Sequence, residues 1–272
     1  MSIWILILLV MTGLGLVFGI ILAFANKKMA VEMNPLIHIV EDVLPKGQCG
    51  ACGYAGCQAY AEAVVLNPDV PPNLCVPGKA VVAKAVAEIT GKQAKETEPH
   101  MAQVRCAGAV GKAVVNFQYE GVQDCLAASL LQGGPKHCNY GCLGQGTCVA
   151  KCPFGALTLS ATGLPVVNAE RCTGCAVCEA VCPRGVIQMI PRSAHVQVDC
   201  NSQEKGAAAR QACSCACLSC TLCVKNCSYG AIHMENNLPV IDHSVCAEKC
   251  TDPTCVSKCP TKAIHRFLSY QG

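Results

Sequence analysis

The first part of the chain is continuously apolar, which predicts a membrane-spanning helix. Residues 3–25 contain no charged side chain, and as an α-helix they would extend about 34 Å, enough to cross a bilayer. Lys27 and Lys28 follow this run, and positive charges beside a span favour the cytoplasmic side. We therefore expect a single-pass anchor over residues 1–26, with Met1 outside and the cysteine-rich remainder of the chain in the cytoplasm.

A cleaved signal peptide is the alternative interpretation of this apolar run. Its end, Ala23-Phe24-Ala25, resembles a cleavage site. However, the run is longer than the apolar core of a signal peptide and lacks a positively charged segment before it. We therefore favour an uncleaved anchor.

Beyond the anchor, the hydrophobic pattern indicates a small helical domain. Residues 27–45 are expected to form a juxtamembrane linker. An amphipathic helix is predicted from Gln58 to Leu66, and an alanine- and valine-rich helix is predicted to end near Gly91. A polar stretch up to about His100 follows. We place the boundary of this domain there and expect it to cover residues 46–100.

Cysteine dominates the chemistry of the chain. It contributes 25 of 272 residues, while there are only one tryptophan and five phenylalanines. A chain of this composition builds little conventional core and needs metals or disulfides to hold it together. Twenty of the cysteines fall into five groups of four. The formal net charge of +3, without basic blocks interleaved with aromatic residues, argues against a nucleic-acid-binding protein.

The clearest group is a run of four cysteines that ends in proline, Cys172-Thr-Gly-Cys175-Ala-Val-Cys178-Glu-Ala-Val-Cys182-Pro183. This is the spacing of bacterial ferredoxins, in which three thiolates bind one iron–sulfur cluster and the fourth binds a neighbouring cluster. Three thiolates spaced closely on a tight loop can reach three irons of one small cube. The fourth thiolate begins a helix and points toward the second cube.

The first group along the chain has a different pattern, C-x2-C-x4-C-x17-C. It consists of Cys49, Cys52, Cys57 and Cys75. The glycines between these cysteines allow the backbone to wrap around a cluster and to direct N–H groups toward sulfur. We expect one [4Fe-4S] cluster in this domain.

The rest of the chain contains an internal repeat of the ferredoxin pattern. Cys152-Pro-Phe-Gly-Ala-Leu and Cys227-Ser-Tyr-Gly-Ala-Ile each precede a short strand–turn–strand pattern, and a second cysteine run begins 20 and 19 residues later. Each repeat is predicted to be a two-cluster ferredoxin-like module, over residues 101–192 and 193–272. The predicted ligand sets are Cys138, Cys142, Cys148 and Cys182; Cys172, Cys175, Cys178 and Cys152; Cys217, Cys220, Cys223 and Cys259; and Cys246, Cys250, Cys255 and Cys227.

Some cysteines depart from the ferredoxin pattern. The loops from Cys138 to Cys148 and from Cys246 to Cys255 are longer than the ideal run, and a three-iron cluster is the alternative there. The cysteines outside the five groups are Cys106, Cys125, Cys200, Cys213 and Cys215. We expect these to be buried small side chains; the alternative is a sixth cluster or an exchange of ligands near residues 213–217. Five clusters predict about 20 irons per chain, and six predict about 24.

Disulfides and zinc are competing explanations for so many cysteines. The cysteine count is odd, and the closely spaced triplets cannot easily bridge one another. Zinc sites pair two C-x2-C units, often with histidine, whereas the seven histidines here show no ligand spacing. A zinc-stapled scaffold without redox activity would be colourless, while [4Fe-4S] clusters give a brown protein. No catalytic residues are predicted, because no paired carboxylates, Ser/His/Asp set or phosphate loop is present.

With these motifs in place, the chain resembles the B subunit of the Rnf complex and of its close relative, the Rsx complex. The resemblance covers essentially the whole chain. It depends on the apolar helix, on Leu44-Pro45 followed by Cys49-Gly-Ala-Cys52-Gly-Tyr-Ala-Gly-Cys57 and Cys75-Val-Pro-Gly, and on Cys138-Asn-Tyr-Gly-Cys142-Leu-Gly-Gln-Gly-Thr-Cys148. The Cys49 motif is specific, and a polyferredoxin subunit of a membrane hydrogenase would lack it. The second ferredoxin module resembles the longer forms of this family in anaerobes.

The resemblance implies an electron-transfer subunit in a bacterial inner (cytoplasmic) membrane. Rnf complexes oxidise reduced ferredoxin, reduce NAD+ and move Na+ or H+ outward. The N-terminal cluster would then be the exit for electrons, and the last module would bind acidic ferredoxin. The basic residues expected to attract it are Lys225, Lys249, Lys258, Lys262 and Arg266. The alternative is the electron wire of an Rsx-type complex that reduces a redox sensor or another acceptor.

These observations together predict an α+β chain. It comprises one N-terminal transmembrane helix, a small mainly helical 4Fe-4S domain and two two-cluster ferredoxin-like modules. The expected cofactors are five [4Fe-4S] clusters. The expected partners are other membrane and flavin subunits of an Rnf-type complex, soluble reduced ferredoxin and the membrane, with no nucleic acid.

Overall fold

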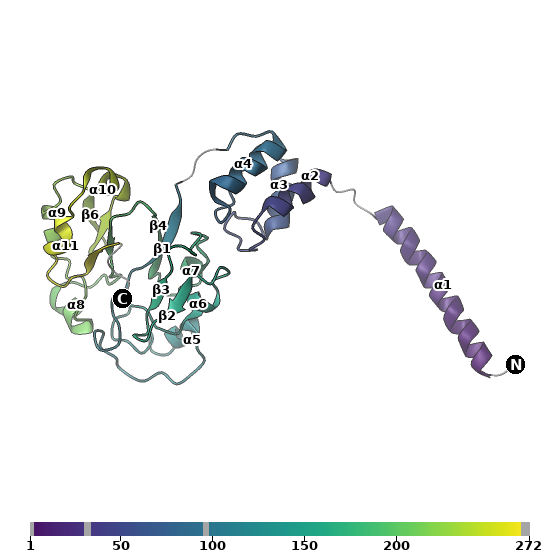
Figure 1. The fold of residues 1–272 in the computed structure, drawn as a ribbon. Helices are drawn as coiled ribbons and strands as arrows, with labels where there is room; N and C mark the ends of the chain where they lie inside the picture. Colours follow the sequence, from purple (N-terminus) through teal and green to yellow (C-terminus); the bar gives the residue numbers. More distant parts are fainter. Residues whose placement is uncertain (1–2, 30–33, 95–97, 268–272) are drawn as a thin grey trace.

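The computed structural model describes residues 3–29, 34–94 and 98–267. Within these ranges, an N-terminal helix precedes a small helical domain and a larger body of short strands and helices (Figure 1). Residues 30–33 of the predicted linker and residues 95–97 of the predicted polar stretch lie outside the described residues.

Helix α1 (Ile3–Met29) corresponds to the apolar run. It is 27 residues long and carries Lys27 and Lys28 in its last turn. Among the described residues, it is the one helix long and apolar enough to cross a membrane, and none of its apolar window is buried inside the protein. A fully exposed apolar helix needs apolar surroundings, which supports a role as a membrane anchor.

Helix α2 (Pro35–Val43) lies where the sequence predicted a linker. The Asn34 side chain caps it by accepting a hydrogen bond from the Leu36 N–H at 3.0 Å. Ile37 and Val40 are buried in the core of the helical domain. The linker prediction is therefore wrong for residues 35–43, because apolar side chains three residues apart give this short segment a face that packs.

Helices α3 (Cys57–Leu66) and α4 (Lys79–Thr90) complete the helical domain and agree with the predicted helices. Helix α4 ends at Gly91, which adopts a left-handed conformation with φ of 68°. Tyr60 is buried at the centre of the domain, and its hydroxyl donates a hydrogen bond to the Pro71 carbonyl at 3.0 Å. The turn after α3 is thereby held close to its core.

Lys92 joins the end of α3 to the same turn. Its ammonium group donates to the carbonyls of Val64, Asn67 and Val70 at 2.7, 2.7 and 2.8 Å. Because Lys92→Met leaves these acceptors without their charged donor, we expect it to lower the free energy of unfolding of the domain by about 2–4 kcal/mol. Faster amide hydrogen exchange in α3 would report this loss. Lys84→Met, at an exposed position of α4, is the control and should leave the exchange rates unchanged.

The larger body is built from four two-stranded antiparallel sheets. In the first unit the pairs are β1 (His100–Val104) with β4 (Ile187–Pro191), and β2 (Leu157–Leu159) with β3 (Pro165–Val167). In the second unit the pairs are β5 (Val196–Val198) with β8 (Ile264–Arg266), and β6 (Ile232–Glu235) with β7 (Leu238–Ile241). Each unit therefore joins its first and last strands and places a hairpin between them.

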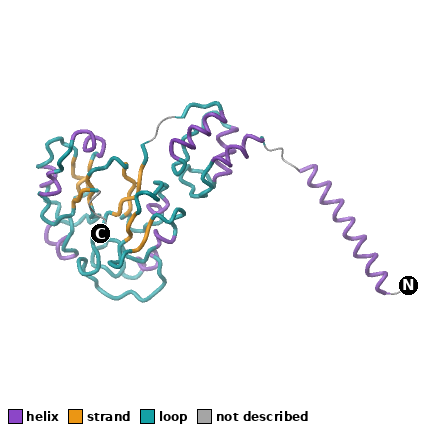
Figure 2. The backbone as a smooth tube through the Cα atoms, in the orientation of Figure 1, coloured by secondary structure: helices purple, strands orange, loops and turns teal. Residues whose placement is uncertain are grey.

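Short helices carry many of the cysteines, and loops make up much of the body (Figure 2). The one-turn helices are α6 (Thr147–Ala150), α7 (Val177–Ala180), α9 (Leu222–Lys225) and α11 (Thr254–Ser257). The others are α5 (Cys125–Leu130), α8 (Gly206–Ala212) and α10 (His243–Lys249). So little regular structure offers few side chains for a core, which makes the fold depend on what the cysteines bind.

The two units meet where β1 and β5 end. The Gln103 side-chain amide donates to the Val198 carbonyl at 3.1 Å, and the Ala107 N–H donates to the Asp199 carbonyl at 2.9 Å. Gln103 and Asp199 are both buried. We call this contact region the seam.

Candidate metal centres

Cysteine side chains surround cavities of similar size. Four cavities of about 280 to 390 Å³ are each lined by several cysteines of the predicted groups. Among the described residues, no three His, Cys, Asp or Glu side chains converge closely enough to hold a single metal ion. Thiols spread around a larger space fit a cube of iron and sulfide better than mononuclear zinc.

The cavity in the helical domain measures about 330 Å³ and is lined by Cys49, Cys52, Cys57 and Cys75. The loop before α3 curls around it because Gly50 and Gly53 adopt positive φ angles of 71° and 84°. The Gln48 side-chain oxygen accepts a hydrogen bond from the Cys57 N–H at 2.9 Å and so positions the start of α3. Burial raises the pKa of Cys75 to about 11, so this thiol requires a bound cation in order to ionise near neutral pH.

A second complete group lies in the first unit. Its cavity of about 280 Å³ is lined by Cys152, Cys172, Cys175 and Cys178. Two backbone groups point at these sulfurs: the Ala102 N–H donates to Cys172 Sγ at 3.5 Å, and the Ala156 N–H donates to Cys152 Sγ at 3.3 Å. Such N–H···S bonds stabilise bound clusters and tune their potentials.

The other cavity of the first unit contains a cysteine that the sequence analysis did not assign. This cavity of about 390 Å³ is lined by Cys125, Cys142, Cys148 and Cys182. The Cys148 thiol interacts electrostatically with Cys125 and Cys182, and burial raises its pKa to about 11. The predicted fourth ligand, Cys138, lines a neighbouring cavity instead.

Local hydrogen bonds hold Cys125 beside Cys148. Cys125 is the first residue of α5, and its N–H donates to Thr147 Oγ1 at 2.7 Å. The Thr147 hydroxyl in turn donates to Asp124 at 3.0 Å, and Asp124 caps α5 by accepting from the Ala127 N–H at 2.9 Å. Because Thr147 directly precedes Cys148, this network connects the two cysteines.

A comparison of two cysteine runs gives an indication of Cys125 that the spacing within a single run does not give. The regular run has cysteines at positions 172, 175, 178 and 182, and the same spacing in the preceding run falls on Cys142, Gln145, Cys148 and Cys152. Gln145 thus occupies the place of the second cysteine. The fourth cysteine that lines this cavity is Cys125, from outside the run.

The structure brings together both predicted groups of the second unit. A cavity of about 350 Å³ is lined by Cys217, Cys220, Cys223 and Cys259. In the other group, Cys255 interacts electrostatically with Cys246, Cys250 and Cys227, and burial raises its pKa to about 12. Cys220 is exposed, so the site formed by Cys217, Cys220, Cys223 and Cys259 comes closest to solvent at Cys220.

The helical domain approaches the first unit at Gly47. A Cβ atom added to Gly47 would lie 2.9 Å from the Phe154 ring, and Phe154 lines the cavity of Cys152. Cys49 and Cys175 interact electrostatically across this contact. The two cavities are therefore neighbours, although they belong to different domains.

A larger side chain at Gly47 should separate these two sites. With a cluster in each cavity, we expect Gly47→Val to slow electron transfer between the Cys175 site and the Cys49 site by about tenfold, because a small displacement of a reacting group has a large effect on rate. Stopped-flow spectroscopy of cluster reduction would measure it. Adding Phe154→Ala should restore part of the rate by making room, and no restoration would contradict the steric explanation.

Two family models match cysteine-rich segments of the chain. One family model, described as "Putative Fe-S cluster", matches residues 44–77. Another, described as "4Fe-4S dicluster domain", matches residues 137–186. The first match contains the cysteines of the helical domain, and the second contains the cysteine runs of the first unit.

Full-length relatives carry one consistent description. The B subunit of a proton-translocating ferredoxin:NAD(+) oxidoreductase complex from Clostridium ljungdahlii is 58% identical, over 97% of this chain and 93% of the relative. The B subunit of an ion-translocating oxidoreductase complex from Methanosarcina acetivorans is 41% identical, over 94% of this chain and 95% of the relative. The B subunit of a Na(+)-translocating ferredoxin:NAD(+) oxidoreductase complex from Acetobacterium woodii is 40% identical, over 94% of this chain and 76% of the relative. The chain therefore belongs to the family of B subunits of Rnf-type ion-translocating oxidoreductase complexes.

Proposed function

We propose that this chain is the iron–sulfur electron-transfer subunit of a membrane complex that oxidises reduced ferredoxin and drives ion translocation. Electrons pass toward NAD+ through partner flavin subunits. Two relatives are named as members of proton- and Na+-translocating ferredoxin:NAD(+) oxidoreductase complexes, so the coupling ion is H+ or Na+. The chain supplies the electron path, and the reaction with NAD+ takes place on another subunit.

The thiol-lined cavities support five [4Fe-4S] clusters, each of which would store and release one electron. This proposal keeps four of the predicted ligand sets and, in the fifth, replaces Cys138 by Cys125. The assigned sets are Cys49, Cys52, Cys57 and Cys75; Cys125, Cys142, Cys148 and Cys182; Cys152, Cys172, Cys175 and Cys178; Cys217, Cys220, Cys223 and Cys259; and Cys227, Cys246, Cys250 and Cys255. In this assignment the last cysteine of each ferredoxin-type run binds the other cluster of its unit.

We assign the two units to the two-cluster ferredoxin-like modules, over residues 101–192 and 193–272. The strand pairings support this assignment, because β1 with β4 and β5 with β8 each close one repeat. The exchange of cysteines within each unit also supports it: Cys152 lines the cavity of Cys172, and Cys182 lines the cavity of Cys148.

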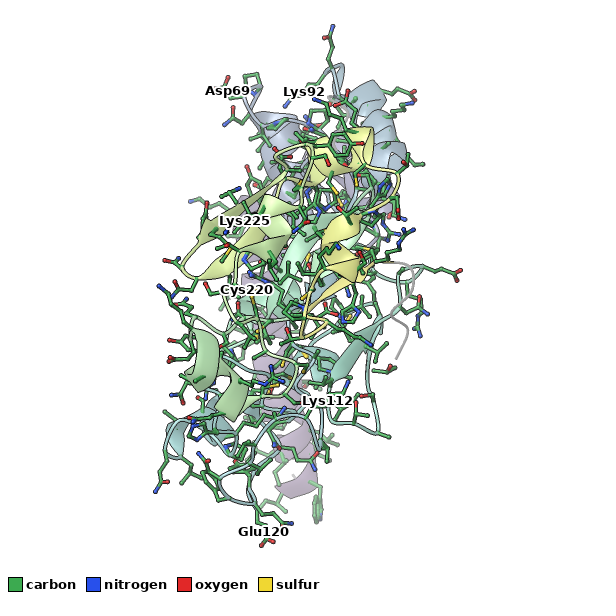
Figure 3. All side chains as sticks on the ribbon, turned by 90° about the vertical axis from the view of Figure 1, so that its left-hand side faces the viewer. Asp69, Lys92, Lys112, Glu120, Cys220 and Lys225 are labelled. Carbon is green, nitrogen blue, oxygen red and sulfur yellow. The ribbon has the colours of Figure 1, made fainter. Side chains whose placement is uncertain are left out.

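The second module is the proposed binding site for reduced ferredoxin. Its exposed Cys220 and the exposed Lys225 of α9 are both labelled in Figure 3. Lys249, Lys258 and Lys262 are also exposed, whereas Arg266 forms an ion pair with Asp252. Exposed positive charges around a cluster attract an acidic partner and accelerate its association.

The helical domain is the proposed exit. It follows the membrane helix in the chain, and Lys27 and Lys28 at the end of α1 favour the cytoplasmic side for everything beyond it. A cluster bound by Cys49 and its partners would therefore lie nearest to the membrane subunits.

Inside-out membrane vesicles provide the test. Vesicles with and without this subunit would receive reduced ferredoxin and NAD+, and NADH formation and ion uptake would be followed together. NADH formation and uptake that both require the subunit are the expected result. Reduction of the clusters without either would contradict the proposal and favour an electron wire that serves another acceptor.

A further inference from the structure

The five cysteines outside the assigned sets, which include the displaced Cys138, meet at the seam between the two units. They line a cavity of about 360 Å³, close to the size of the cavities assigned to clusters. The lining cysteines are Cys106, Cys138, Cys200, Cys213 and Cys215. Since the first two belong to one unit and the others to the second, no single cysteine run contains this site.

The internal repeat relates these cysteines in pairs. Cys138 lies four residues before Cys142, and Cys213 lies four residues before Cys217, the first cysteines of the two corresponding runs. Two further cysteines follow the first strand of each unit: Cys106 lies two residues after β1, and Cys200 lies two residues after β5. Each unit thus contributes the same two positions to the seam.

Equivalent hydrogen bonds reach the sulfurs of the second pair. The Cys142 N–H donates to Cys106 Sγ at 3.4 Å, and the Cys217 N–H donates to Cys200 Sγ at 3.2 Å. The donors and the acceptors of these two bonds occupy matching positions in the repeat. Backbone N–H groups directed at sulfur are a feature of iron–sulfur sites.

We propose that Cys106, Cys138, Cys200 and Cys213 bind a sixth [4Fe-4S] cluster that bridges the two modules. This inference deepens the proposed function and rests on it, because it adds a cluster to the same electron path. The chain would then hold six clusters. Cys106, Cys200 and Cys213 would be ligands and not ordinary buried side chains, and Cys138 would bind this cluster and not the one of Cys142.

Cys215 lies in the same cavity but is not a ligand in this assignment. Its thiol donates a hydrogen bond to the Ala107 carbonyl at 3.2 Å, and its sulfur lies 3.4 Å from Cys213 Sγ. The corresponding position of the first unit is Tyr140, so the first unit has no cysteine equivalent to Cys215. Cys215 is therefore the control for the four ligands.

The surroundings of the cavity suit a bound anion. A [4Fe-4S] cluster with four thiolates carries a net charge of about −2 when oxidised. Lys112 and Lys136 both interact electrostatically with Cys213, and the Lys136 ammonium is held in place by the Gly108 carbonyl at 2.7 Å. Gly108 lies against both sulfurs, since a Cβ atom there would be in van der Waals contact with Cys106 Sγ at 3.4 Å and with Cys213 Sγ at 3.5 Å.

A cluster at the seam would complete the electron path. Cys200 interacts electrostatically with both Cys217 and Cys106, and Cys142 interacts with Cys106. One electron would arrive from the cluster of Cys217, which is thereby oxidised, and would leave to the cluster of Cys142, which is thereby reduced. Electron transfer slows steeply with distance. Without a cluster at the seam, the modules would exchange electrons directly across it, over a longer distance and therefore more slowly.

The test is the iron and sulfide content of the full-length chain, purified without oxygen in detergent. We expect about 24 irons for the wild type and for Cys215→Ser, and about 20 for Cys106→Ser and Cys200→Ser. With reduced ferredoxin, reduction of the first module should slow at least tenfold in Cys106→Ser and Cys200→Ser, while the second module is reduced normally.

Other outcomes separate this inference from the proposed function. About 20 irons in the wild type, with normal NADH formation in vesicles, would overturn the sixth cluster and leave the function in place. About 24 irons in a chain that supports no NADH formation would keep the cluster and overturn the function. Loss of iron from Cys215→Ser would contradict the ligand assignment. The wild-type count needs no substitution, so a variant that fails to fold does not affect it.

Discussion

Cys125→Ser will remove about four irons from the chain, whereas the sequence alone marks Cys125 as an ordinary buried residue. The reason is its position beside Cys148 in a cavity that also contains Cys142 and Cys182. Electron transfer out of the first module should fall at least tenfold, because an internal cluster is lost. Iron and sulfide assays and the kinetics of cluster reduction would measure the two effects.

Gln145→Cys provides a second test of the assignment of Cys125. It restores the regular C-x2-C-x2-C spacing of the run that begins at Cys142. In the Cys125→Ser background it should recover the four lost irons, since a thiol at the second position of a ferredoxin run points at the cluster. Unchanged iron content in Cys125→Ser would instead show that Cys138 is the fourth ligand, as spacing along the chain predicts.

Cys52→Ser will separate the uptake of electrons from their delivery. It removes one ligand of the cluster in the helical domain, so about four irons should be lost while the clusters of both modules remain. Reduced ferredoxin should still reduce the modules at the wild-type rate. NADH formation in vesicles should fall by at least about tenfold, because this cluster is the proposed exit.

The control for Cys52→Ser is Cys215→Ser, which replaces a half-buried cysteine outside the assigned sets. It should leave both iron content and NADH formation unchanged. Wild-type NADH formation by Cys52→Ser would mean that electrons leave the chain from a module and bypass the helical domain. That outcome would contradict the exit assignment without affecting the ferredoxin-binding end.

Much of the fold could be predicted because its signals are local. The apolar run, the helix that ends at Gly91 and the two hairpins each depend on residues close together in sequence. The helix at residues 35–43 was missed because it is short, and its buried face is recognisable only once α3 and α4 cover it.

Some of the candidate sites could likewise be predicted from local spacing, and others could not. Cys172 and Cys175 lie on a loop and Cys178 lies on the one-turn helix α7 that follows it. Spacing alone therefore predicts that they share a cavity with Cys152. Cys125 could not be assigned in this manner, because its approach to Cys148 depends on the capping of α5 and on Thr147. The same limit applies to the seam, where cysteines of two different units meet.

By itself, the sequence determined an N-terminal helix apolar enough to cross a membrane and cysteine motifs of iron–sulfur domains, and its motifs determined the family. These conclusions depend on local features, because the spacing of a cysteine run is set by the size of the iron–sulfur cluster and is independent of the rest of the fold. Only the tertiary structure decided that Cys125 joins Cys148 and that Cys106 faces the cysteines of the second unit. The first contact depends on the capping of α5 and on Thr147. The second depends on the hydrogen bonds from Gln103 and Ala107 that bring the ends of β1 and β5 together, and no spacing along the chain encodes either distance.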